Sequence, residues 1–198
     1  MFERRPRVSD RLDRDYFENL YARSSDPWDF ETSEYERRKY TRTLGVLGGR
    51  HFRRALEVGA SIGVFTAMLA PYCDELLAVD TSERAVAEAK KRLSEFEHVR
   101  VERRTLPEET PEGPFDLIVA SEVLYYLPRE TMLEALRRLE RILAPGGSFL
   151  AVHWRKETRT YPLQGDEVHE LLLQNSRLDR VQSIVEEEYR LDLLEDRS

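Results

Sequence analysis

The stretch LEVGASIGVFT, Leu56–Thr66, decides how the rest of this chain is interpreted. It begins as a short apolar strand and ends as the first turn of a helix, with Gly59 and Gly63 in the loop between them. A glycine loop of this kind lets the backbone approach a ligand closely, and the helix that follows points its free N–H groups at that ligand. The stretch therefore predicts a strand–loop–helix unit that resembles a nucleotide-binding turn.

Elements of alternating type flank this loop on both sides. Five short apolar strands alternate with helical segments, which is typical of β-α crossovers and a parallel sheet. The last two strands follow each other too closely for a crossover, so they should pair antiparallel. In chain order the predicted elements are helices 9–22 and 33–47, strand 55–59, helix 64–72, strand 75–80, helix 83–96, strand 99–106, strand 115–121 turning helical near Glu122, helix 129–143 stopped by Pro145-Gly146-Gly147, strand 148–154, helix 165–175, and strands 178–188 and 189–195.

This pattern predicts an α/β, Rossmann-like fold with helices on both faces of the sheet. The sheet should have seven strands, mostly parallel, with an antiparallel strand at the C-terminal end. The 198 residues suit one domain, residues 1–198, in which residues 1–48 form an N-terminal helical lid and residues 49–198 form the core.

Composition limits the setting of the protein. Hydrophobic residues make up 40% of the chain and charged residues 35%, and no run approaches the roughly 20 apolar residues of a membrane span. The basic N-terminus has no apolar run behind it, so we expect no secretory signal and no membrane partner. Cys73 is the only cysteine, which excludes a disulfide framework and favours the cytoplasm.

Charge and spacing exclude further classes. The net charge of −7 argues against a nucleic-acid partner, because phosphate contacts require a basic surplus. The segment DEVHE lacks the H-E-x-x-H spacing of a zinc site, so no metal is expected. A small-molecule acceptor is the expected partner, and the oligomeric state is left open between a monomer and a weak dimer.

The expected ligand site lies at the carboxyl ends of the strands. Asp80 ends the second strand about 20 residues after Gly59, where an acid commonly accepts the hydroxyls of a ribose. The dinucleotide motif G-x-G-x-x-G fails at Ser61 and Val64, which disfavours a nicotinamide oxidoreductase. A P-loop fails as well, because no Gly-Lys-Ser/Thr follows.

The loop does resemble the first motif of class I S-adenosylmethionine-dependent methyltransferases, acid-x-G-x-G-x-G. Glu57, Gly59 and Gly63 match this motif, and Ser61 replaces its middle glycine. The resemblance continues through FDLIVASEVLYYL and LAPGGSFLAVHW, so that it covers about residues 55–154.

A narrower resemblance covers almost the whole chain, from about Tyr16 to Leu193. The segments DPWDFETSEYERRKYTRTL, SEVLYYL and HWR…YPLQGDEVHE are similar to the rhizobial nodulation N-methyltransferase (NodS-like) family. Members of that family carry a serine at the position of Ser61. The resemblance implies a class I methyltransferase fold, S-adenosyl-L-methionine as cofactor with S-adenosyl-L-homocysteine as product, and methylation of a free amine, in the nodulation case on a de-N-acetylated chitooligosaccharide.

The resemblance also implies cofactor contacts. Glu57 would fix the loop from beneath or reach the methionyl ammonium, and Asp80 would hold the ribose. Arg38 or Lys39 would meet the cofactor carboxylate. The family fold often has an acid after the third strand for the adenine amino group, and here Thr105 or a backbone carbonyl must replace it. The expected cofactor-binding residues are Tyr35, Arg38, Glu57, Gly59, Ala60, Ser61, Gly63, Asp80, Thr81, Thr105, Leu106 and Ser121.

Amine methylation requires a group that accepts a proton, because a protonated amine has no lone pair. The expected catalytic residues are Glu122, His153 and Tyr126, and the expected substrate-binding residues are Trp28, Tyr125, Asp166 and His169. Each has a structural alternative. Glu122 would then only cap a helix, His153 would be a hydrogen-bonded structural histidine, and His169 would face solvent.

Two other functions stay open at this point. An O-methyltransferase of a small metabolite would share the same cofactor loop. A non-catalytic protein that binds S-adenosylmethionine would share it too.

Overall fold

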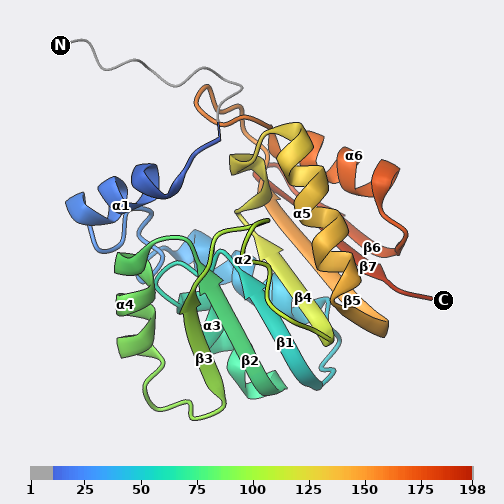
Figure 1. Ribbon diagram of the computed structural model, residues 1–198, viewed down its shortest axis with the longest axis horizontal. Helices are drawn as coiled ribbons and strands as arrows, with labels where there is room; N and C mark the ends of the chain where they lie inside the picture. Colours follow the sequence, from blue (N-terminus) through green and yellow to red (C-terminus); the bar gives the residue numbers. More distant parts are fainter. Residues whose placement is uncertain (1–10, 198) are drawn as a thin grey trace.

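A single twisted sheet forms the centre of the computed structural model, which describes residues 11–197 (Figure 1). Its order is β3-β2-β1-β4-β5-β7-β6. The strands are β1 (Phe52–Val58), β2 (Cys73–Asp80), β3 (Val99–Arg103), β4 (Phe115–Ser121), β5 (Leu143–Trp154), β6 (Asp179–Val185) and β7 (Tyr189–Glu195).

Strand directions confirm the predicted sheet. β1 to β5 pair parallel, and β7 pairs antiparallel with both β5 and β6. The connection between β6 and β7 is too short for a crossover, so a hairpin is the available solution. The chain order reverses between β1 and β4, which is the switch point where doubly wound sheets bind ligands. The Rossmann-like fold expected from the sequence is therefore present.

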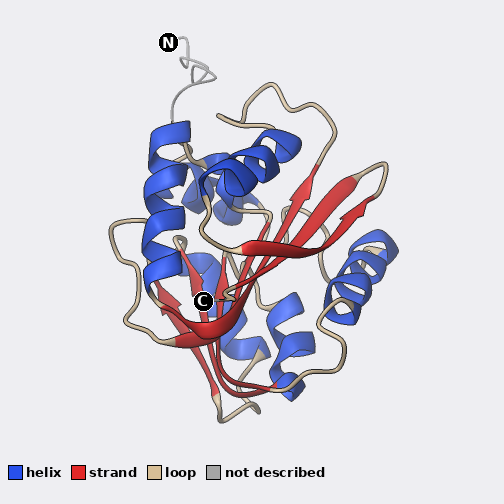
Figure 2. Ribbon diagram, turned by 90° about the vertical axis from the view of Figure 1, so that its right-hand side faces the viewer, coloured by secondary structure: helices blue, strands red, loops and turns tan. Residues whose placement is uncertain are grey.

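Helices cover both faces of the sheet (Figure 2). Packing of the buried side chains places α2, α3 and α4 with one face and α5 and α6 with the other. The helix α1 contacts α4 near the carboxyl ends of the strands (Figure 1). The helices are α1 (Arg14–Arg23), α2 (Glu34–Gly45), α3 (Val64–Leu69), α4 (Glu83–Arg92), α5 (Arg129–Arg141) and α6 (Gly165–Asn175).

The continuous apolar runs of the central strands follow from this double cover. In β1, Ala55 packs on the α2/α3 side, while its neighbour Leu56 packs on the α5/α6 side, and both are fully buried. Successive side chains of a strand point to opposite faces, so both positions must be apolar when both faces are covered. Between residues 11 and 197, no helix combines the length and the apolar composition needed to cross a bilayer.

Side-chain caps define the helix starts that the sequence predicts. Ser33 Oγ accepts the N–H of Glu36 at 3.2 Å, and Ser82 caps α4 in the same way. α1 begins at Arg14 with Asp13 as its cap, five residues later than the predicted bound at Ser9, which lies outside the described residues.

Several predicted bounds differ by a few residues, and the one at the PGG segment is wrong about the type of structure. The helix before the PGG segment ends at Arg141, and the segment lies inside β5, which begins at Leu143 instead of Ser148. The pairing with β4 shifts register there, from Leu143 opposite Phe115 to Ser148 opposite Leu117. A bulge of this kind accepts a proline and a glycine within a strand, because the extra residues leave the ladder.

Candidate functional site

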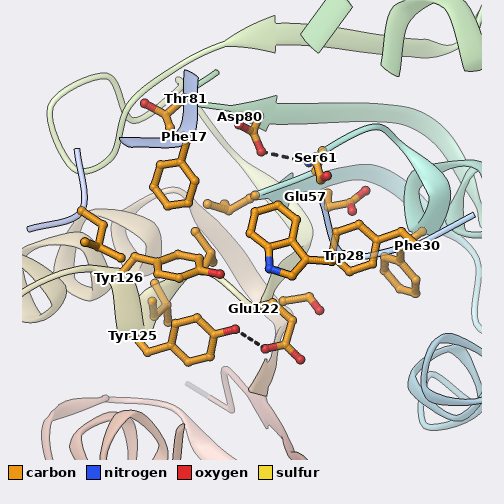
Figure 3. Close-up of a pocket in the computed structure, with 18 of the residues that line it drawn as sticks. Phe17, Trp28, Phe30, Glu57, Ser61, Asp80, Thr81, Glu122, Tyr125 and Tyr126 are labelled. Carbon is orange, nitrogen blue, oxygen red and sulfur yellow. Dashed lines mark hydrogen bonds between the residues drawn. The ribbon is translucent and has the colours of Figure 1, made fainter. Parts of the chain in front are cut away.

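A cavity of about 420 Å³ opens at the carboxyl ends of β1, β2 and β4, beneath α1 and the start of α2. Figure 3 shows side chains from these elements converging on it. Most of the predicted site residues line this cavity, namely Trp28, Tyr35, Glu57, Gly59, Ala60, Ser61, Asp80, Thr81, Thr105, Leu106, Ser121, Glu122, Tyr125 and Tyr126.

The loop after β1 is shaped by left-handed backbone conformations. Gly59 has φ +78° and Ser61 has φ +50°. A Cβ on Gly59 would also lie 2.9 Å from the Cβ of Val123, so the close approach of this loop to the loop after β4 requires glycine. The Oγ of Ser61 lies 2.5 Å from the hydroxyl of Tyr21, which ties the loop to α1.

Asp80 holds the same loop from the end of β2. Its Oδ2 accepts the N–H of Ser61 at 2.9 Å, and its Oδ1 accepts the N–H of Ser82 at 2.9 Å (Figure 3 shows the first of these bonds). Burial raises the pKa of Asp80 despite these bonds. Each carboxylate oxygen can accept more than one hydrogen bond, so Asp80 still has capacity for ligand hydroxyls at the cavity.

Glu57 is a buried carboxyl group with an unpaired oxygen. Its side chain lies at the cavity and the residue is 2% exposed, while Oε2 has no hydrogen-bond partner among the described residues. Burial raises its pKa to about 8. A buried carboxyl oxygen without a partner is costly, and a ligand cation such as an ammonium would supply the missing partner and the opposite charge. The residues present therefore fit an amino-acid-like group at this end of the cavity.

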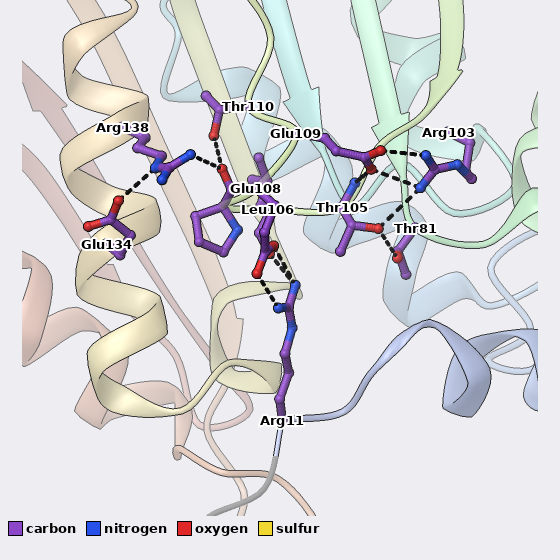
Figure 4. Close-up of polar contacts among 11 residues, drawn as sticks. Arg11, Thr81, Arg103, Thr105, Leu106, Glu108, Glu109, Thr110, Glu134 and Arg138 are labelled. Carbon is purple, nitrogen blue, oxygen red and sulfur yellow. Dashed lines mark hydrogen bonds and ion pairs between the residues drawn. The ribbon is translucent and has the colours of Figure 1, made fainter.

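At the other end, two threonines and an apolar side chain line the cavity. Thr81 Oγ1 and Thr105 Oγ1 lie 2.7 Å apart, and Leu106 follows in the same loop. Glu109 is the acid that contacts Thr105, but its carboxylate accepts the N–H of Thr105 and pairs with Arg103 (Figure 4). Its hydrogen bonds from Arg103 lower the pKa of Glu109 to about 2. This wall is thus polar without being acidic.

The N-terminal segment is fastened to this loop. Arg11 donates to both carboxylate oxygens of Glu108, at 2.7 and 3.1 Å, and also to the carbonyl of Leu106 (Figure 4). Glu18 on α1 accepts the N–H of Glu83 at the start of α4, at 2.5 Å. These contacts hold α1 over the cavity.

Glu122 is the centre of a polar network on the acceptor side. Its Oε1 lies 2.7 Å from Lys39 Nζ, and its Oε2 accepts from the hydroxyl of Tyr125 at 2.5 Å and from the N–H of Trp154 at 2.9 Å. Glu122 also has φ +54°, a conformation that a non-glycine residue adopts only where its surroundings hold it. The side chain does not cap a helix.

Lys39 is buried between two carboxylates. It is 2% exposed, and its Nζ lies 3.0 Å from Glu36 Oε1 as well as 2.7 Å from Glu122. Burial alone would lower the pKa of Lys39, but the two carboxylates raise it above its ordinary value. Burial raises the pKa of Glu36, while the ammonium of Lys39 acts in the opposite direction. With all three groups ionised, two carboxylates and one ammonium carry one formal negative charge beside the cavity.

The structure brings Lys39 to the cavity and does not bring Arg38 there. The side chain of Arg38 is 73% exposed and faces Glu34 at 3.9 Å. Successive residues of a helix point about 100° apart, so only one of the two can face the sheet. Gly63 does not line the cavity either, because it lies against Ala89 of α4 and against Leu93, the residue after that helix.

Three other predicted residues lie away from the cavity. His153 and His169 are fully buried, hydrogen-bonded to each other rather than exposed to a ligand. His169 was expected either to bind substrate or to face solvent, and the structure contradicts both, because its side chain faces neither the cavity nor solvent. Asp166 pairs with Arg155 at 2.8 Å, and this partner lowers the pKa of Asp166. The geometry therefore assigns these three residues no direct contact with an acceptor.

Aromatic rings complete the cavity wall, and some of them were missed. Trp28 stacks on Phe30 with ring centroids 5.5 Å apart. Phe17 and Tyr21, one helical turn apart on α1, also line the cavity, as does Tyr161 from the loop before α6. The i, i+4 spacing of these two aromatics indicates only a shared helix face, because spacing does not encode which element the face will meet.

Comparison with known proteins agrees with this geometry. The family model described as Nodulation protein S (NodS) matches residues 10–184. Nodulation protein S of Sinorhizobium fredii (strain NBRC 101917 / NGR234) is 35% identical over 126 residues, which are 63% of this chain. Nodulation protein S of Bradyrhizobium diazoefficiens is 38% identical over 127 residues, which are 61% of this chain. The matched region spans 58% of the length of each of these curated relatives.

A solved structure matches over nearly its whole length. The N-methyltransferase NodS from Bradyrhizobium japonicum WM9, crystallised in complex with S-adenosyl-L-homocysteine, has a TM-score of 0.83 and 27% sequence identity. The match covers 91% of this chain and 98% of that one. This match, together with the sheet order described above, identifies the fold as that of class I methyltransferases.

Proposed function

The chain belongs to the nodulation protein S family, and we propose that it is an S-adenosylmethionine-dependent N-methyltransferase. Its acceptor is the free amine of a small molecule, such as a de-N-acetylated amino sugar or oligosaccharide. The related NodS structure, which holds S-adenosyl-L-homocysteine, supports this choice of cofactor.

The residues that would hold the cofactor follow from the cavity. Glu57 supplies an unpaired buried carboxyl group for the methionyl ammonium, and Asp80 supplies acceptors for the ribose hydroxyls. Thr81, Thr105 and Leu106 line the part of the cavity that suits the adenine ring. When bound, S-adenosylmethionine supplies a methyl group that its sulfonium already activates.

The negative charge around Lys39 is the observation that carries the amine acceptor. When all three are ionised, Glu36, Lys39 and Glu122 together bear one uncompensated negative charge, and they are largely buried, where charge is weakly screened. Such a site favours a cationic acceptor over a neutral alcohol or a carboxylate. The aromatic walls add cation–π attraction and a flat apolar surface for a sugar ring.

Glu122 is the residue best placed to receive the acceptor proton. It lines the cavity and its side chain is 12% exposed, so a bound amine can reach it. Tyr125 and the N–H of Trp154 hold Oε2 and Lys39 holds Oε1, so three donors orient the carboxylate. A carboxylate held in this way accepts a proton from an ammonium without having to reorganise.

The N-terminal segment completes the site by excluding water. Phe17, Tyr21 and Trp28 cover the cavity from α1 and the turn after it. Exclusion of water strengthens the charge interactions inside and prevents proton loss to solvent.

Incubation of the full chain with S-adenosylmethionine and a glucosamine oligomer tests the proposal. We expect a mass gain of one methylene unit per transfer, located on nitrogen by fragmentation. The fully N-acetylated oligomer is the matched control, because it has no free amine. Methylation of oxygen alone would contradict the amine acceptor, and tight binding of S-adenosyl-L-homocysteine without turnover on a broad set of amines would contradict catalysis.

A further inference from the structure

A buried chain of hydrogen bonds runs from β7 to the loop after β4. Asp192 Oδ2 lies 2.7 Å from His169 Nδ1, and His169 Nε2 lies 3.2 Å from His153 Nδ1. His153 Nε2 lies 3.3 Å from the backbone nitrogen of Leu124. Both imidazoles are fully buried and Asp192 is 1% exposed, so water does not compete for these bonds.

Chemistry determines the direction of every bond in this chain. The N–H of Leu124 can only donate, so His153 Nε2 must accept and carries no proton. The proton of His153 is then on Nδ1 and is donated to His169 Nε2. His169 likewise carries its proton on Nδ1 and donates it to Asp192. Both histidines are neutral in the same, less common tautomer.

The electrostatic surroundings agree with neutral rings and an ionised acid. Burial lowers the pKa of His153 well below its ordinary range, and it lowers the pKa of His169 as well. Burial alone would raise the pKa of Asp192, but the bond from His169 and the charge of Arg190 hold it below its ordinary value. Arg190 Nε lies 3.0 Å from the same Oδ2.

The hydrogen-bond chain ends at the loop after β4, which carries the carboxylate of Glu122. Three consecutive residues of β5 hold this loop. Val152 O accepts the N–H of Glu122 at 2.8 Å, His153 Nε2 accepts the N–H of Leu124, and the N–H of Trp154 donates to Glu122 Oε2 at 2.9 Å. Of the three, only the bond of His153 comes from a side chain.

That side chain meets a specific need. Leu124 is fully buried at the start of a single 3₁₀ turn, Leu124–Tyr126, where its N–H has no intrahelical acceptor. A buried N–H without a partner would cost free energy and loosen the turn. The His153 ring also packs edge-on against Tyr125, with ring centroids 5.2 Å apart.

Close packing of α6 is what brings the second histidine into place. Gly165 begins α6, and a Cβ there would lie 1.9 Å from the carbonyl oxygen of Trp154. The helix therefore starts directly against the end of β5, and His169 lies one turn further along it. Without this approach the two rings would not meet.

We propose that Asp192, His169 and His153 form a one-directional hydrogen-bond chain whose role is to position Glu122 and Tyr125 through the backbone of Leu124. The inference rests on the proposed function, since it assigns these residues to the acceptor side of the methyltransferase site. They are positioning residues and not catalytic ones, because none of them lines the cavity.

The tautomers provide a test that needs no substrate. The whole protein has only four histidines, so each imidazole can be assigned in ¹⁵N NMR spectra with single substitutions. We expect His153 and His169 both to show protonated Nδ1 and unprotonated Nε2 in the ligand-free protein. A protonated Nε2 or an imidazolium at either position near neutral pH would overturn the proposed chain.

Two substitutions at one position separate positioning from packing. In His153→Gln the amide oxygen can still accept from Leu124, whereas His153→Asn keeps a donor for His169 and leaves the Leu124 N–H without an acceptor. We expect kcat to fall about tenfold or more in His153→Asn and by about threefold or less in His153→Gln. The affinity for S-adenosyl-L-homocysteine should change in neither, because its predicted contacts lie on the other side of the cavity.

Amide hydrogen exchange at Leu124 keeps this test independent of turnover. Exchange should accelerate in His153→Asn and stay near the wild-type rate in His153→Gln, with the free energy of unfolding measured for both. Equal exchange rates, or a lower kcat for the Gln variant than for the Asn variant, would overturn the positioning role. If the wild-type protein methylates no amine while tautomers and exchange rates are as expected, the proposed function fails and the hydrogen-bond chain stands.

Discussion

Lys39 Nζ lies 2.7 Å from Glu122 Oε1, a contact that joins α2 to the loop after β4 across 83 residues of sequence. Lys39 is almost completely buried, and Glu36 on its other side makes it the shared cation of two carboxylates. The acceptor side of the cavity is thus built around one ion cluster rather than around separate residues.

Removing the cation from this cluster should destabilise the fold. In Lys39→Met the carboxylates of Glu36 and Glu122 lose the cation that they share, and we expect the free energy of unfolding to fall by about 3 kcal/mol or more in urea denaturation. Arg38→Met is the matched control, because the exposed ion pair between Arg38 and Glu34 should contribute less than about 1 kcal/mol to stability. Equal effects of the two substitutions would show that Lys39 is not held as the structure describes.

Glu122→Gln should remove the proton acceptor while keeping the shape of the site. We expect kcat to fall by about a hundredfold or more, with S-adenosyl-L-homocysteine affinity near the wild-type value in calorimetry. Tyr125→Phe retains the carboxylate and loses only one donor to Oε2, so its loss of kcat should be smaller. Wild-type kcat in Glu122→Gln would exclude this residue as the base.

Glu57 should make the stability of the ligand-free protein depend on pH. Its pKa is raised from 4.5 to about 8 in the folded state, so between these values the folded protein binds a proton that the unfolded chain has lost. Stability should therefore fall as pH rises through this window, by up to about 1.4 kcal/mol per pH unit from this group, and should level off above it.

Glu57→Gln should abolish that dependence. The variant should match the wild type near pH 4.5 and exceed its stability at pH 8, as measured by chemical denaturation across the window. Glu75→Gln, at an exposed carboxylate on β2, serves as the control and should leave the pH profile unchanged. A constant difference between wild type and Glu57→Gln at all pH values would contradict the raised pKa.

Ser61 should tolerate glycine but not a large side chain. Its backbone has φ +50° and lines the cavity, so leucine would be strained and would occupy ligand space. We expect Ser61→Leu to abolish binding of S-adenosyl-L-homocysteine in calorimetry and Ser61→Gly to retain it. Tyr21→Phe removes the same hydroxyl contact as Ser61→Gly and should behave like it. Equal binding by the leucine and glycine variants would place the ligand elsewhere.

Gly165 and Gly45 form a matched pair for the packing of α6. A Cβ at Gly165 would lie 1.9 Å from a backbone oxygen, whereas one at Gly45 would have nothing within 4 Å. Gly165→Ala should lower Tm strongly, because backbone must move, and Gly45→Ala should leave Tm equal or slightly higher through helix propensity. A small effect of Gly165→Ala would show that α6 can move away from β5 without loss.

Much of the fold was predictable because its information is local. The strand–loop–helix unit at Gly59, the acid at the end of β2 and the antiparallel closing hairpin all follow from short patterns and connection lengths. The PGG segment misled the prediction, since proline and glycine mark both a helix end and a bulge, and only the pairing of Leu143 with Phe115 distinguishes the two.

The site was less predictable, because its residues come together from distant elements. Lys39 and Arg38 are adjacent and chemically similar, and the rotation of α2 on the sheet decides which of them is buried. His153 and His169 both carry features typical of site residues. Their contact with each other and with Asp192 depends on how closely α6 packs against β5.

Patterns of spacing and hydrophobicity were sufficient for the alternation of strands and helices and for a nucleotide-type loop, and the family followed from the resemblance of short motifs to known sequences. They act over a few residues, where sterics and periodicity constrain the chain directly. The ion cluster around Lys39 and the histidine chain behind Glu122 depend instead on helix rotation and on contacts between segments far apart in sequence. These contacts are determined by how the whole core packs, so a local sequence pattern does not predict them.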